Sequence, residues 1–387
     1  MKVEKDNLSH WIMLLISGIN IIFSIPFRFF KPKRTKRVVF FYQMHGNSQA
    51  LMEYIQLHDS SIEMYFLAFP EYLKIYDGKH KLPTLSMLNP IDMIRVAQSD
   101  VIVTNYGSLT LRYYAKWTSL KLVDVWHGLP MLKNQTPMIM NYLNNYSEIW
   151  VSSPAMKDFY RERYKLRSHL EVTGYGRVDK LVMGGYNKVS VCQKYGLPLD
   201  KKIILIAPTW KHNNPDRSEL PFGLTSTDFI SELNALADAT NSHVVFRAHM
   251  LSDDLSAASS NITALSSHDY PDTEEIISIA DIVVTDWSSI AFDFMVTERP
   301  VVFIDGQPPF VGKELSTRCT PANRFGPIVS DIGIFKDIIK RYLDTPSSYI
   351  EENKDSIDHI KKVAYGDTLD GRATERYFKR LKQLLEG

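Results

Sequence analysis

Cysteine is scarce in this sequence: its 387 residues include only two, Cys192 and Cys319. Two cysteines cannot supply a disulfide framework or a cysteine-rich metal site, and they fit a reducing compartment. An excess of charge of one sign is also lacking, because 45 basic and 44 acidic residues leave a net charge of +1. Proteins that bind nucleic acid over a broad surface carry a strong basic excess. Nucleic acid is therefore not an expected partner.

Glycine-rich phosphate-binding motifs are lacking as well. The segment His45-Gly46-Asn47-Ser48, which follows the first expected strand, does not have the glycine spacing of a dinucleotide fingerprint. No phosphate-binding loop ending in Gly-Lys-Ser/Thr occurs, so nicotinamide redox chemistry and ATP hydrolysis are disfavoured. Carboxylates do not cluster at ligand spacing. We therefore predict no metal site and no cofactor, while the metal dependence of the reaction stays open.

One long apolar run is present, from Trp11 to Phe30, and it carries no charge until Arg28. Basic residues follow it at once: Lys31, Lys33, Arg34, Lys36 and Arg37. Pro26 interrupts the run, and weakly polar residues share one helical face: His10, Met13, Ser17, Asn20 and Ser24. This pattern predicts that residues 1–37 form an amphipathic helix with a basic collar at an anionic membrane surface, peripheral or monotopic, on the cytoplasmic face. A buried helix of the core is the alternative.

The rest of the chain alternates short apolar runs with helix-like segments. The expected strands are Val38 to Tyr42, Glu63 to Ala68, Val101 to Thr104, Lys121 to Val125, Glu148 to Val151, Ile203 to Ile206, His243 to Phe246, Ile282 to Val284 and Val301 to Phe303. The turn-rich stretch from Gly196 to Lys202 predicts a boundary between domains 38–195 and 196–387, and helices are expected from about Ile332 onward. Such alternation predicts an α/β fold with parallel sheets, whose ligands bind at the carboxyl ends of the strands.

The most informative local pattern follows the strand expected at Ile282 to Val284. Asp286 comes directly after this strand, and Ser288 and Ser289 open a segment with helical spacing of apolar residues. A helix start combines unpaired main-chain N–H groups with a favourable dipole, and the two hydroxyls add donors for a phosphate. An ordinary serine N-cap is the alternative interpretation.

Five short motifs lie at or just after expected strand ends, and a sixth lies near the end of the chain. They are Trp126-His127-Gly128-Leu129-Pro130 with Lys133; Thr173-Gly174-Tyr175-Gly176-Arg177-Val178-Asp179; Ala207-Pro208-Thr209-Trp210-Lys211; Phe246-Arg247-Ala248-His249; Thr285-Asp286-Trp287-Ser288-Ser289 with Phe292-Asp293-Phe294; and Asp370-Gly371-Arg372-Ala373-Thr374-Glu375-Arg376. In order and approximate spacing they resemble the CDP-glycerol glycerophosphotransferase family over roughly residues 100 to 376. The short N-terminal helix looks more like the primase type than the longer polymerases.

The resemblance implies a GT-B-type fold, in which two Rossmann-like domains with parallel sheets face each other across a cleft. The N-terminal domain would face the acceptor and the C-terminal domain would bind the CDP-linked donor. The implied reaction transfers glycerol phosphate, or a related alditol phosphate, to a hydroxyl of a lipid-linked saccharide and releases CMP. Its product would be a teichoic-acid-like or capsular polymer.

The motifs also imply residue roles. His127 and His249 are the candidate catalytic residues, since imidazole can exchange a proton near neutral pH. The candidate substrate-binding residues are Gly128, Lys133, Arg177, Thr209, Lys211, Arg247, Asp286, Ser288, Ser289 and Arg376. Arg247, Lys211, Arg318 or Arg376 would offset charge that develops on the phosphate.

Departures from the family pattern leave the substrate open. Leu129 and Met250 flank the two histidines where the family usually has threonine and proline, and Trp287 and Gly176 replace a usual tyrosine and proline. The alditol is therefore glycerol, ribitol or another polyol, and primase and polymerase behaviour are both open. A GT-B-type glycosyltransferase with a nucleotide-activated sugar and a non-catalytic membrane-bound scaffold are the alternatives.

Overall fold

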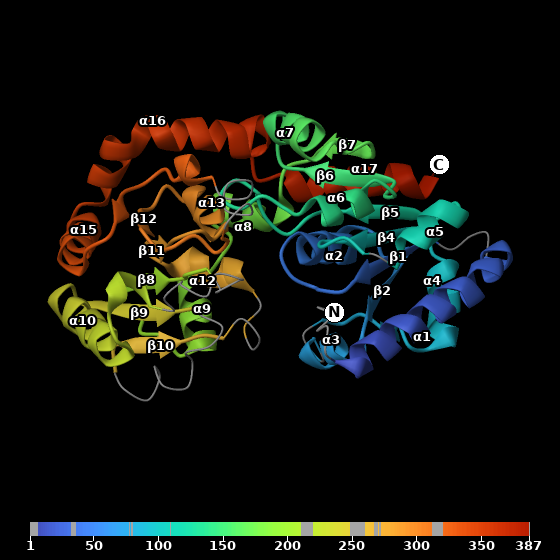
Figure 1. The fold of residues 1–387 in the computed structure, drawn as a ribbon, viewed down its shortest axis with the longest axis horizontal. Coiled ribbons are helices and arrows are strands. Elements are labelled where there is room, and N and C mark those ends of the chain that lie inside the picture. Colours follow the sequence, from blue (N-terminus) through green and yellow to red (C-terminus); the bar gives the residue numbers. More distant parts are fainter. Residues whose placement is uncertain are drawn as a thin grey trace. The chain divides into compact units, whose positions relative to one another are not determined.

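The computed structural model describes residues 7–31, 36–76, 78, 80–108, 110–209, 220–247, 260–266, 270, 272–311 and 320–386. Its chain forms two compact units. The first comprises Met1–His127, Thr136–Asp179 and Tyr365–Gly387, and the second comprises Gly128–Gln135 and Lys180–Ala364. Each unit holds one sheet with helices packed on it (Figure 1).

The sheet of the first unit has seven strands in the order β3-β2-β1-β4-β5-β6-β7, and its pairings are parallel. The strands are β1 (Lys36–Phe41), β2 (Ile62–Ala68), β3 (Thr84–Ser86), β4 (Val101–Thr104), β5 (Lys121–Asp124), β6 (Glu148–Val151) and β7 (His169–Val172). In register, Phe41 pairs with Thr104 and Thr104 pairs with Asp124. The loops that follow β1, β4 and β5 therefore start side by side at one edge of this sheet.

The helices of the first unit are α1 (Leu8–Ser24), α2 (Asn47–His58), α3 (Pro70–Ile75), α4 (Pro90–Ala97), α5 (Arg112–Trp117), α6 (Pro137–Leu143), α7 (Pro154–Tyr164) and α17 (Ala373–Glu386). Two of these helices, α4 and α7, have proline as their first residue and a polar capping residue directly before it. Asn89 accepts a hydrogen bond from the N–H of Ile91 at 2.9 Å before α4, and Ser153 accepts one from the N–H of Met156 at 3.0 Å before α7.

The sheet of the second unit has six strands in the order β10-β9-β8-β11-β12-β13, again with parallel pairings. They are β8 (Lys202–Ile206), β9 (Ser242–Phe246), β10 (Ile262–Ala264), β11 (Ile282–Thr285), β12 (Val301–Ile304) and β13 (Ile328–Val329). Its helices are α8 (Asp179–Val182, from the last residue of the first unit), α9 (Lys188–Tyr195), α10 (Ser226–Ala239), α12 (Thr273–Ile279), α13 (Ile290–Met295), α15 (Ile332–Asp344) and α16 (Pro346–Ala364). Strands β11 and β12 are buried throughout, as a parallel sheet covered on both faces requires.

All nine strands expected from the sequence are present, and the C-terminal segment is helical as expected. The units nevertheless differ from the expected domains. Helix α9 belongs to the second unit, where Tyr195 donates a hydrogen bond to Glu275 of α12 at 2.6 Å. Helix α17 returns to the first unit and packs on α2. The amphipathic pattern of a helix does not say which of two sheets it covers. Position along the chain therefore did not predict the units to which α9 and α17 belong.

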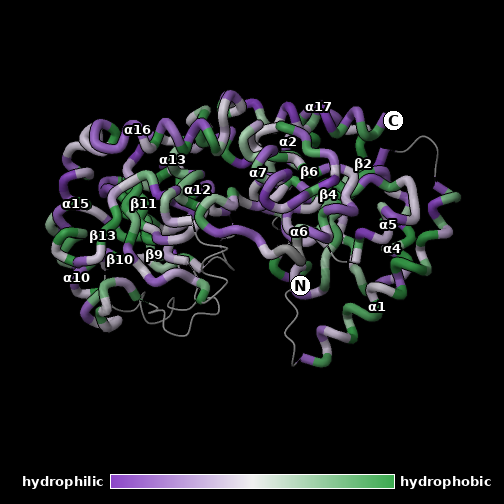
Figure 2. The backbone as a smooth tube through the Cα atoms, turned by 45° about the horizontal axis from the view of Figure 1, so that its top comes forward, coloured by the Kyte–Doolittle hydropathy of each residue, from purple (hydrophilic) through white to green (hydrophobic). Residues whose placement is uncertain are grey.

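Helix α1 is part of the first unit and packs against α4 through its weakly polar face. Asn20 donates a hydrogen bond to the carbonyl of Met87 at 3.2 Å, and the hydroxyls of Ser24 and Tyr114 lie 2.6 Å apart. The opposite face is apolar and exposed: Leu8, Trp11, Ile12, Leu15, Ile16, Ile19, Ile22 and Phe23. Figure 2 shows this hydrophobic character along α1. The polarity is the reverse of that of a helix on a water-soluble domain, which buries its apolar side.

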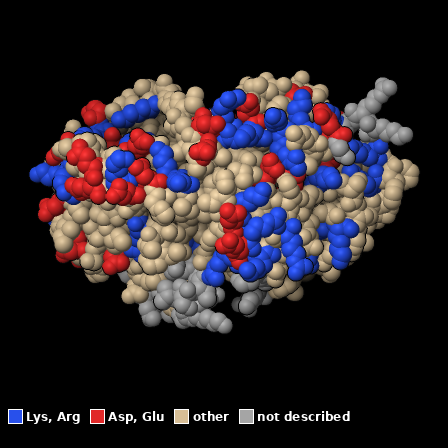
Figure 3. All heavy atoms as spheres, turned by 90° about the horizontal axis from the view of Figure 1, so that it is seen from above, with Lys and Arg blue, Asp and Glu red and all other residues tan. Residues whose placement is uncertain are grey.

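Helices α16 and α17 carry charges of both signs. Lys354 pairs with Asp358 at 2.5 Å in α16, and Arg372 pairs with Glu375 at 2.8 Å where α17 begins. Figure 3 shows basic and acidic side chains interspersed over the visible face. Exposed pairs of this kind contribute little to the free energy of unfolding, so burial in the two sheets is the main stabilising feature.

Candidate active site

A buried carboxylate organises the loops at the carboxyl edge of the first sheet. Asp124, the last residue of β5, is fully buried and accepts three hydrogen bonds. The donors are the hydroxyl of Thr104 at 2.5 Å, the N–H of Gly107 at 2.8 Å and the N–H of Trp126 at 2.8 Å. Burial raises the pKa of Asp124 to about 6, and the three hydrogen bonds oppose that rise. The carboxylate thus ties the loop after β4 to the loop after β5.

These two loops fix the imidazole of His127. Its Nδ1 lies 2.8 Å from the carbonyl oxygen of Asn105, and its ring stacks on Tyr106 with centroids 3.8 Å apart and planes at 8°. A carbonyl only accepts, so Nδ1 carries the proton and Nε2 holds the lone pair of the neutral ring. This is the tautomer that a general base needs if Nε2 is to take a proton from a substrate hydroxyl.

The backbone around His127 is also held from α2 and from the second motif. Asn47 donates to the carbonyls of Val125 at 2.9 Å and Trp126 at 3.0 Å, and accepts the N–H of Arg177 at 3.1 Å. The guanidinium of Arg177 in turn donates to the carbonyl of His127. Arg177, expected from the sequence to bind substrate, is therefore seen to support the main chain of the candidate base.

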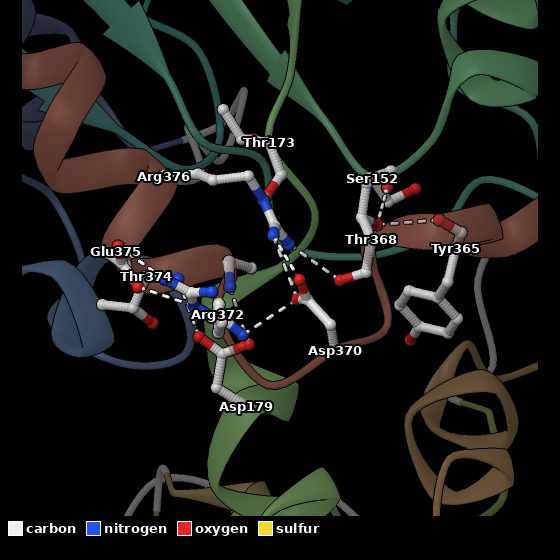
Figure 4. A network of polar contacts seen from close by, with 11 residues as sticks. Ser152, Thr173, Asp179, Tyr365, Thr368, Asp370, Arg372, Thr374, Glu375 and Arg376 are labelled. Carbon is white, nitrogen blue, oxygen red and sulfur yellow. Dashed lines mark hydrogen bonds and ion pairs between the residues drawn. The ribbon is translucent and has the colours of Figure 1, made fainter.

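The sixth motif braces the second. Arg376 donates through Nε to the carbonyl of Thr173 at 2.7 Å, through Nη1 to Asp370 at 2.8 Å and through Nη2 to the carbonyl of Thr368 at 2.8 Å (Figure 4). This ion pair lowers the pKa of Asp370. Arg376 thus has a protein partner at each guanidinium nitrogen, and its expected contact with substrate stays a prediction.

Asp179 joins the same two motifs. Its carboxylate accepts the N–H groups of Ala373 at 3.1 Å and Thr374 at 2.7 Å, which caps the start of α17. Burial raises the pKa of Asp179, and the bonds from Thr374 oppose the shift. A Cβ at Gly176 would lie 2.6 Å from the hydroxyl of Thr374, so this position requires glycine for close approach. The sixth motif therefore fixes α17 to the segment that carries Arg177.

In the second unit, Asp286 has the corresponding place after β11. Its Oδ1 accepts the N–H groups of Thr209 at 2.8 Å and of Trp287. The indole of Trp287 donates to the carbonyl of Gly306 at 3.1 Å, so loops after β8, β11 and β12 are linked. The structure thus brings together Thr209 and Asp286, two residues predicted from separate motifs.

Ser288 and Ser289 follow this junction and are partly exposed. Ser288 accepts the N–H of Ile290 at 3.5 Å, a long cap contact, and Ser289 makes no cap bond with its side chain. Helix α13 has six residues, so its dipole is small and the hydroxyls, rather than the helix terminus, are the groups suited to a phosphate.

Arg324 was not expected from the sequence. Its guanidinium lies 4.1 Å from the centre of the Trp287 ring and 3.6 Å from Asp305, and its side chain is 3% exposed. A cation on the face of a tryptophan is a stabilising arrangement. Arg324 lies far from Trp287 in sequence and outside the six motifs, so no local pattern indicated it.

Of the remaining predicted residues, the structure describes Arg247, Gly128 and Lys133. Arg247 directly follows β9 and donates to the carbonyl of Tyr270 at 2.8 Å and to Thr273 at 2.9 Å, and burial lowers its pKa. Gly128 and Lys133 belong to the second unit, where the N–H of Thr320 bonds the carbonyl of Leu132 at 3.0 Å. Four residues lie outside the described part of the structure: Lys211, His249, Met250 and Arg318. Within the described ranges, no group of three or more His, Cys, Asp or Glu is placed to hold a metal ion.

Comparison with known proteins finds relatives that are named as enzymes of teichoic acid synthesis. The chain is 25% identical over 353 residues to the teichoic acid glycerol-phosphate transferase of Staphylococcus aureus, covering 82% of this chain and 86% of that protein. It is 25% identical over 292 residues to the teichoic acid glycerol-phosphate primase of Bacillus spizizenii, covering 70% and 71%. It spans 44% of the teichoic acid poly(glycerol phosphate) polymerase of Bacillus subtilis, at 21% identity over 86% of this chain.

Solved structures show the same fold. The wall teichoic acid polymerase TagF matches with a TM-score of 0.71 at 16% identity, over 98% of both chains. The UDP-GlcNAc 2-epimerase of Neisseria meningitidis matches with a TM-score of 0.53 at 12% identity, over 90% of this chain and 100% of that one. The two parallel sheets are therefore those of the GT-B type, as expected. The family model for CDP-glycerol:poly(glycerophosphate) glycerophosphotransferases matches residues 23–381, and this chain belongs to that family.

Proposed function

We propose that this protein transfers glycerol phosphate from CDP-glycerol to a hydroxyl of a lipid-linked saccharide and releases CMP. The hydroxyl oxygen attacks the phosphorus next to glycerol, a new O–P bond forms, and the bond from that phosphorus to the bridging oxygen breaks. CMP leaves with that oxygen, and the proton of the hydroxyl passes to Nε2 of His127. One geometric observation carries the assignment: the Asn105 carbonyl fixes the tautomer of His127 that can accept this proton.

The donor side of the proposal rests on the second unit. The main chain of Thr209 is bonded to Asp286, and Ser288 and Ser289 follow Asp286 in the chain. Hydroxyls of this kind are donors that suit the oxygens of a pyrophosphate. The roles expected from the sequence for His249, Lys211 and Arg318 are also part of this proposal. His249 would contact donor phosphate, and the two cations would offset the charge that grows on CMP.

Membrane association is a further part of the proposal. The exposed apolar face of α1 supports it, since the helix is bound to its own domain by polar groups and presents leucine, isoleucine and aromatic side chains outward. With η1 (Ile25–Phe30), this is a helical segment long and apolar enough to cross a membrane by length and composition. We propose that it lies in the surface of the cytoplasmic leaflet, where a lipid-linked acceptor would be reached.

One experiment separates this function from a sugar transfer on the same fold. The full-length protein is incubated with a synthetic lipid-linked disaccharide and with CDP-glycerol, CDP-ribitol or a UDP-sugar, and nucleotide release is followed. We expect CMP release from CDP-glycerol that depends on the acceptor. Release of UDP alone would contradict the proposal. Mass analysis of the lipid product then distinguishes a single added unit from a chain.

A further inference from the structure

Three tyrosines form a continuous row at the carboxyl edge of the first sheet. Tyr42 follows β1, Tyr106 follows β4, and Tyr72 lies on α3. The rings of Tyr42 and Tyr72 have centroids 4.4 Å apart and their hydroxyls lie 2.6 Å apart. The rings of Tyr42 and Tyr106 meet edge to face at 5.8 Å. All three side chains are partly exposed, unlike the tyrosines of the core.

This row ends at the candidate base, because Tyr106 is the ring on which His127 stacks. Polar groups border the row there. His45 meets the edge of Tyr106 at 6.4 Å, and its Nε2 lies 2.8 Å from the side-chain oxygen of Gln43. Aromatic faces with hydrogen-bonding groups at their rim are the usual composition of a small-molecule site.

The other end of the row lies towards α1. Glu71, the neighbour of Tyr72 on α3, approaches His10 of α1 at 3.5 Å. The row therefore leads from the helix with the exposed apolar face to the imidazole of His127. A saccharide carried by a membrane lipid would need such a path between lipid and base.

The backbone at this edge is strained at the middle residue of the row and beside the candidate base. Tyr42 has φ of 80° and Trp126 has φ of 52°, and both follow strands whose ends lie next to the base. Large residues in this left-handed region are uncommon, and such strain concentrates at ligand sites. Here it is found at a row tyrosine and at the residue before His127.

We propose that Tyr42, Tyr72 and Tyr106 form the subsite for the saccharide of the acceptor. The apolar C–H face of a sugar ring would pack on the aromatic rings, while its hydroxyls would bond the tyrosine hydroxyls, Gln43 and His45. This inference rests on the proposed function, in that it identifies where the acceptor of that reaction binds.

Tyr72 is the residue to test, because it lies at the far end of the row from His127. Tyr72→Ala removes a stacking ring and should raise the KM for a short-chain lipid-linked disaccharide roughly three- to tenfold. The KM for CDP-glycerol and the kcat at saturating acceptor should stay within twofold. Tyr72→Leu, which keeps apolar bulk without a ring, should show the same rise, and Tyr72→Phe should retain most of the affinity.

Tyr113→Ala is the matched control, since Tyr113 is a partly exposed tyrosine of the same unit that stacks on Trp117. It should leave the acceptor KM unchanged. An unchanged acceptor KM in both Tyr72→Ala and Tyr72→Leu would overturn the subsite. A rise in the KM for CDP-glycerol instead of the acceptor KM would overturn it as well.

Calorimetric titration with the disaccharide alone keeps this inference apart from the proposed reaction. Weaker binding to Tyr72→Ala than to wild type supports the subsite even if CDP-glycerol proves not to be the donor. Equal binding by both proteins refutes the subsite even if CMP release from CDP-glycerol is confirmed.

Discussion

Asp124 and Asp286 each link two neighbouring loops through hydrogen bonds, one in each of the two sheets. Each lies at the carboxyl end of a central strand, accepts an N–H from its own loop, and accepts a second N–H from the loop after the neighbouring strand. In the first unit the loops tied in this way carry His127 and its partners, and in the second they carry Thr209 and the two serines. A buried carboxylate thus sets the position of each set of candidate site residues.

The first prediction concerns the Asp124 junction. Asn at this position keeps one acceptor oxygen and replaces the other by an amide that only donates, so a buried N–H of Gly107 or Trp126 loses its partner. An unsatisfied buried N–H costs about 1–3 kcal/mol. Asp124→Asn should therefore lower the free energy of unfolding by that amount at pH 4, where Asp124 is protonated in the folded protein. At neutral pH it should lower kcat at least tenfold, with the KM for CDP-glycerol unchanged. Urea unfolding and steady-state kinetics measure both, with exposed Asp358→Asn as the control.

The second prediction concerns pH. Burial raises the pKa of Asp124 from its ordinary value of 3.8 to about 6, so the folded state binds this proton more tightly than the unfolded state does. Its contribution to stability is therefore fully present below about pH 4 and is lost as the pH rises through about 6. The free energy of unfolding of wild type, relative to that of Asp124→Asn, should therefore fall by on the order of 3 kcal/mol over that window. Above the window the difference should stay constant. A difference that does not change between pH 4 and 7 would contradict the raised pKa.

Interior strands were predictable and edge strands were not. The nine strands found from the sequence include every interior strand, and strands such as β4 and β11 are continuous apolar runs buried on both faces. The four missed strands, β3, β7, β10 and β13, are the edges of the two sheets. They have two to four residues and mixed burial. An edge strand pairs with one neighbour only and is partly open to solvent. These strands are therefore short and lack the continuous apolar run by which a buried strand is recognised.

The candidate site was predictable only as far as single motifs extend. His127, Asp286 and the serines stand in recognisable local patterns, whereas the residues that hold them come from elsewhere in the chain. Asn47 stands in a segment that lacks a glycine fingerprint, yet its side chain donates to the carbonyl oxygens of Val125 and Trp126. Such partners are set by strand order, which places the β1 and β5 loops together through β4. Strand order is not visible in local spacing.

The third prediction assigns the chemistry of the two histidines. His127→Ala removes the proposed base and should lower kcat about a hundred- to ten-thousand-fold while CDP-glycerol still binds. His249→Ala should weaken donor binding as well. Stopped assays of CMP release and calorimetry with CDP-glycerol measure the two effects, and His58→Ala, at an exposed histidine of α2, is the control. Loss of donor binding in His127→Ala with donor binding retained in His249→Ala would reverse the roles. A slowing of less than tenfold in both variants would exclude either histidine as the base.

The fourth prediction concerns the donor phosphate. Changing Ser288 and Ser289 together to alanine removes two neutral donors, each worth about 0.5–1.5 kcal/mol. The affinity for CDP-glycerol should fall by roughly one to two powers of ten, with an unchanged melting temperature because both side chains are partly exposed. Calorimetry on the double variant tests this, and Ser348→Ala, at another partly exposed serine, is the control. Unchanged donor affinity would remove both serines from the site.

The last prediction concerns the exposed face of α1. Leu15 and Ile22 are 65% and 60% exposed on that face, so glutamate at both positions should leave the packing on α4 intact. Charged side chains are costly to place among lipid acyl chains, and glutamate is also repelled by anionic headgroups. The double variant should therefore lose most of its binding to vesicles containing anionic lipid while still using a short-chain soluble acceptor. Sedimentation with vesicles measures the binding, and Leu57→Glu, 81% exposed on α2, is the control. If the double variant unfolds, the face packs against protein instead; if it folds and binds vesicles like wild type, α1 is not the membrane contact.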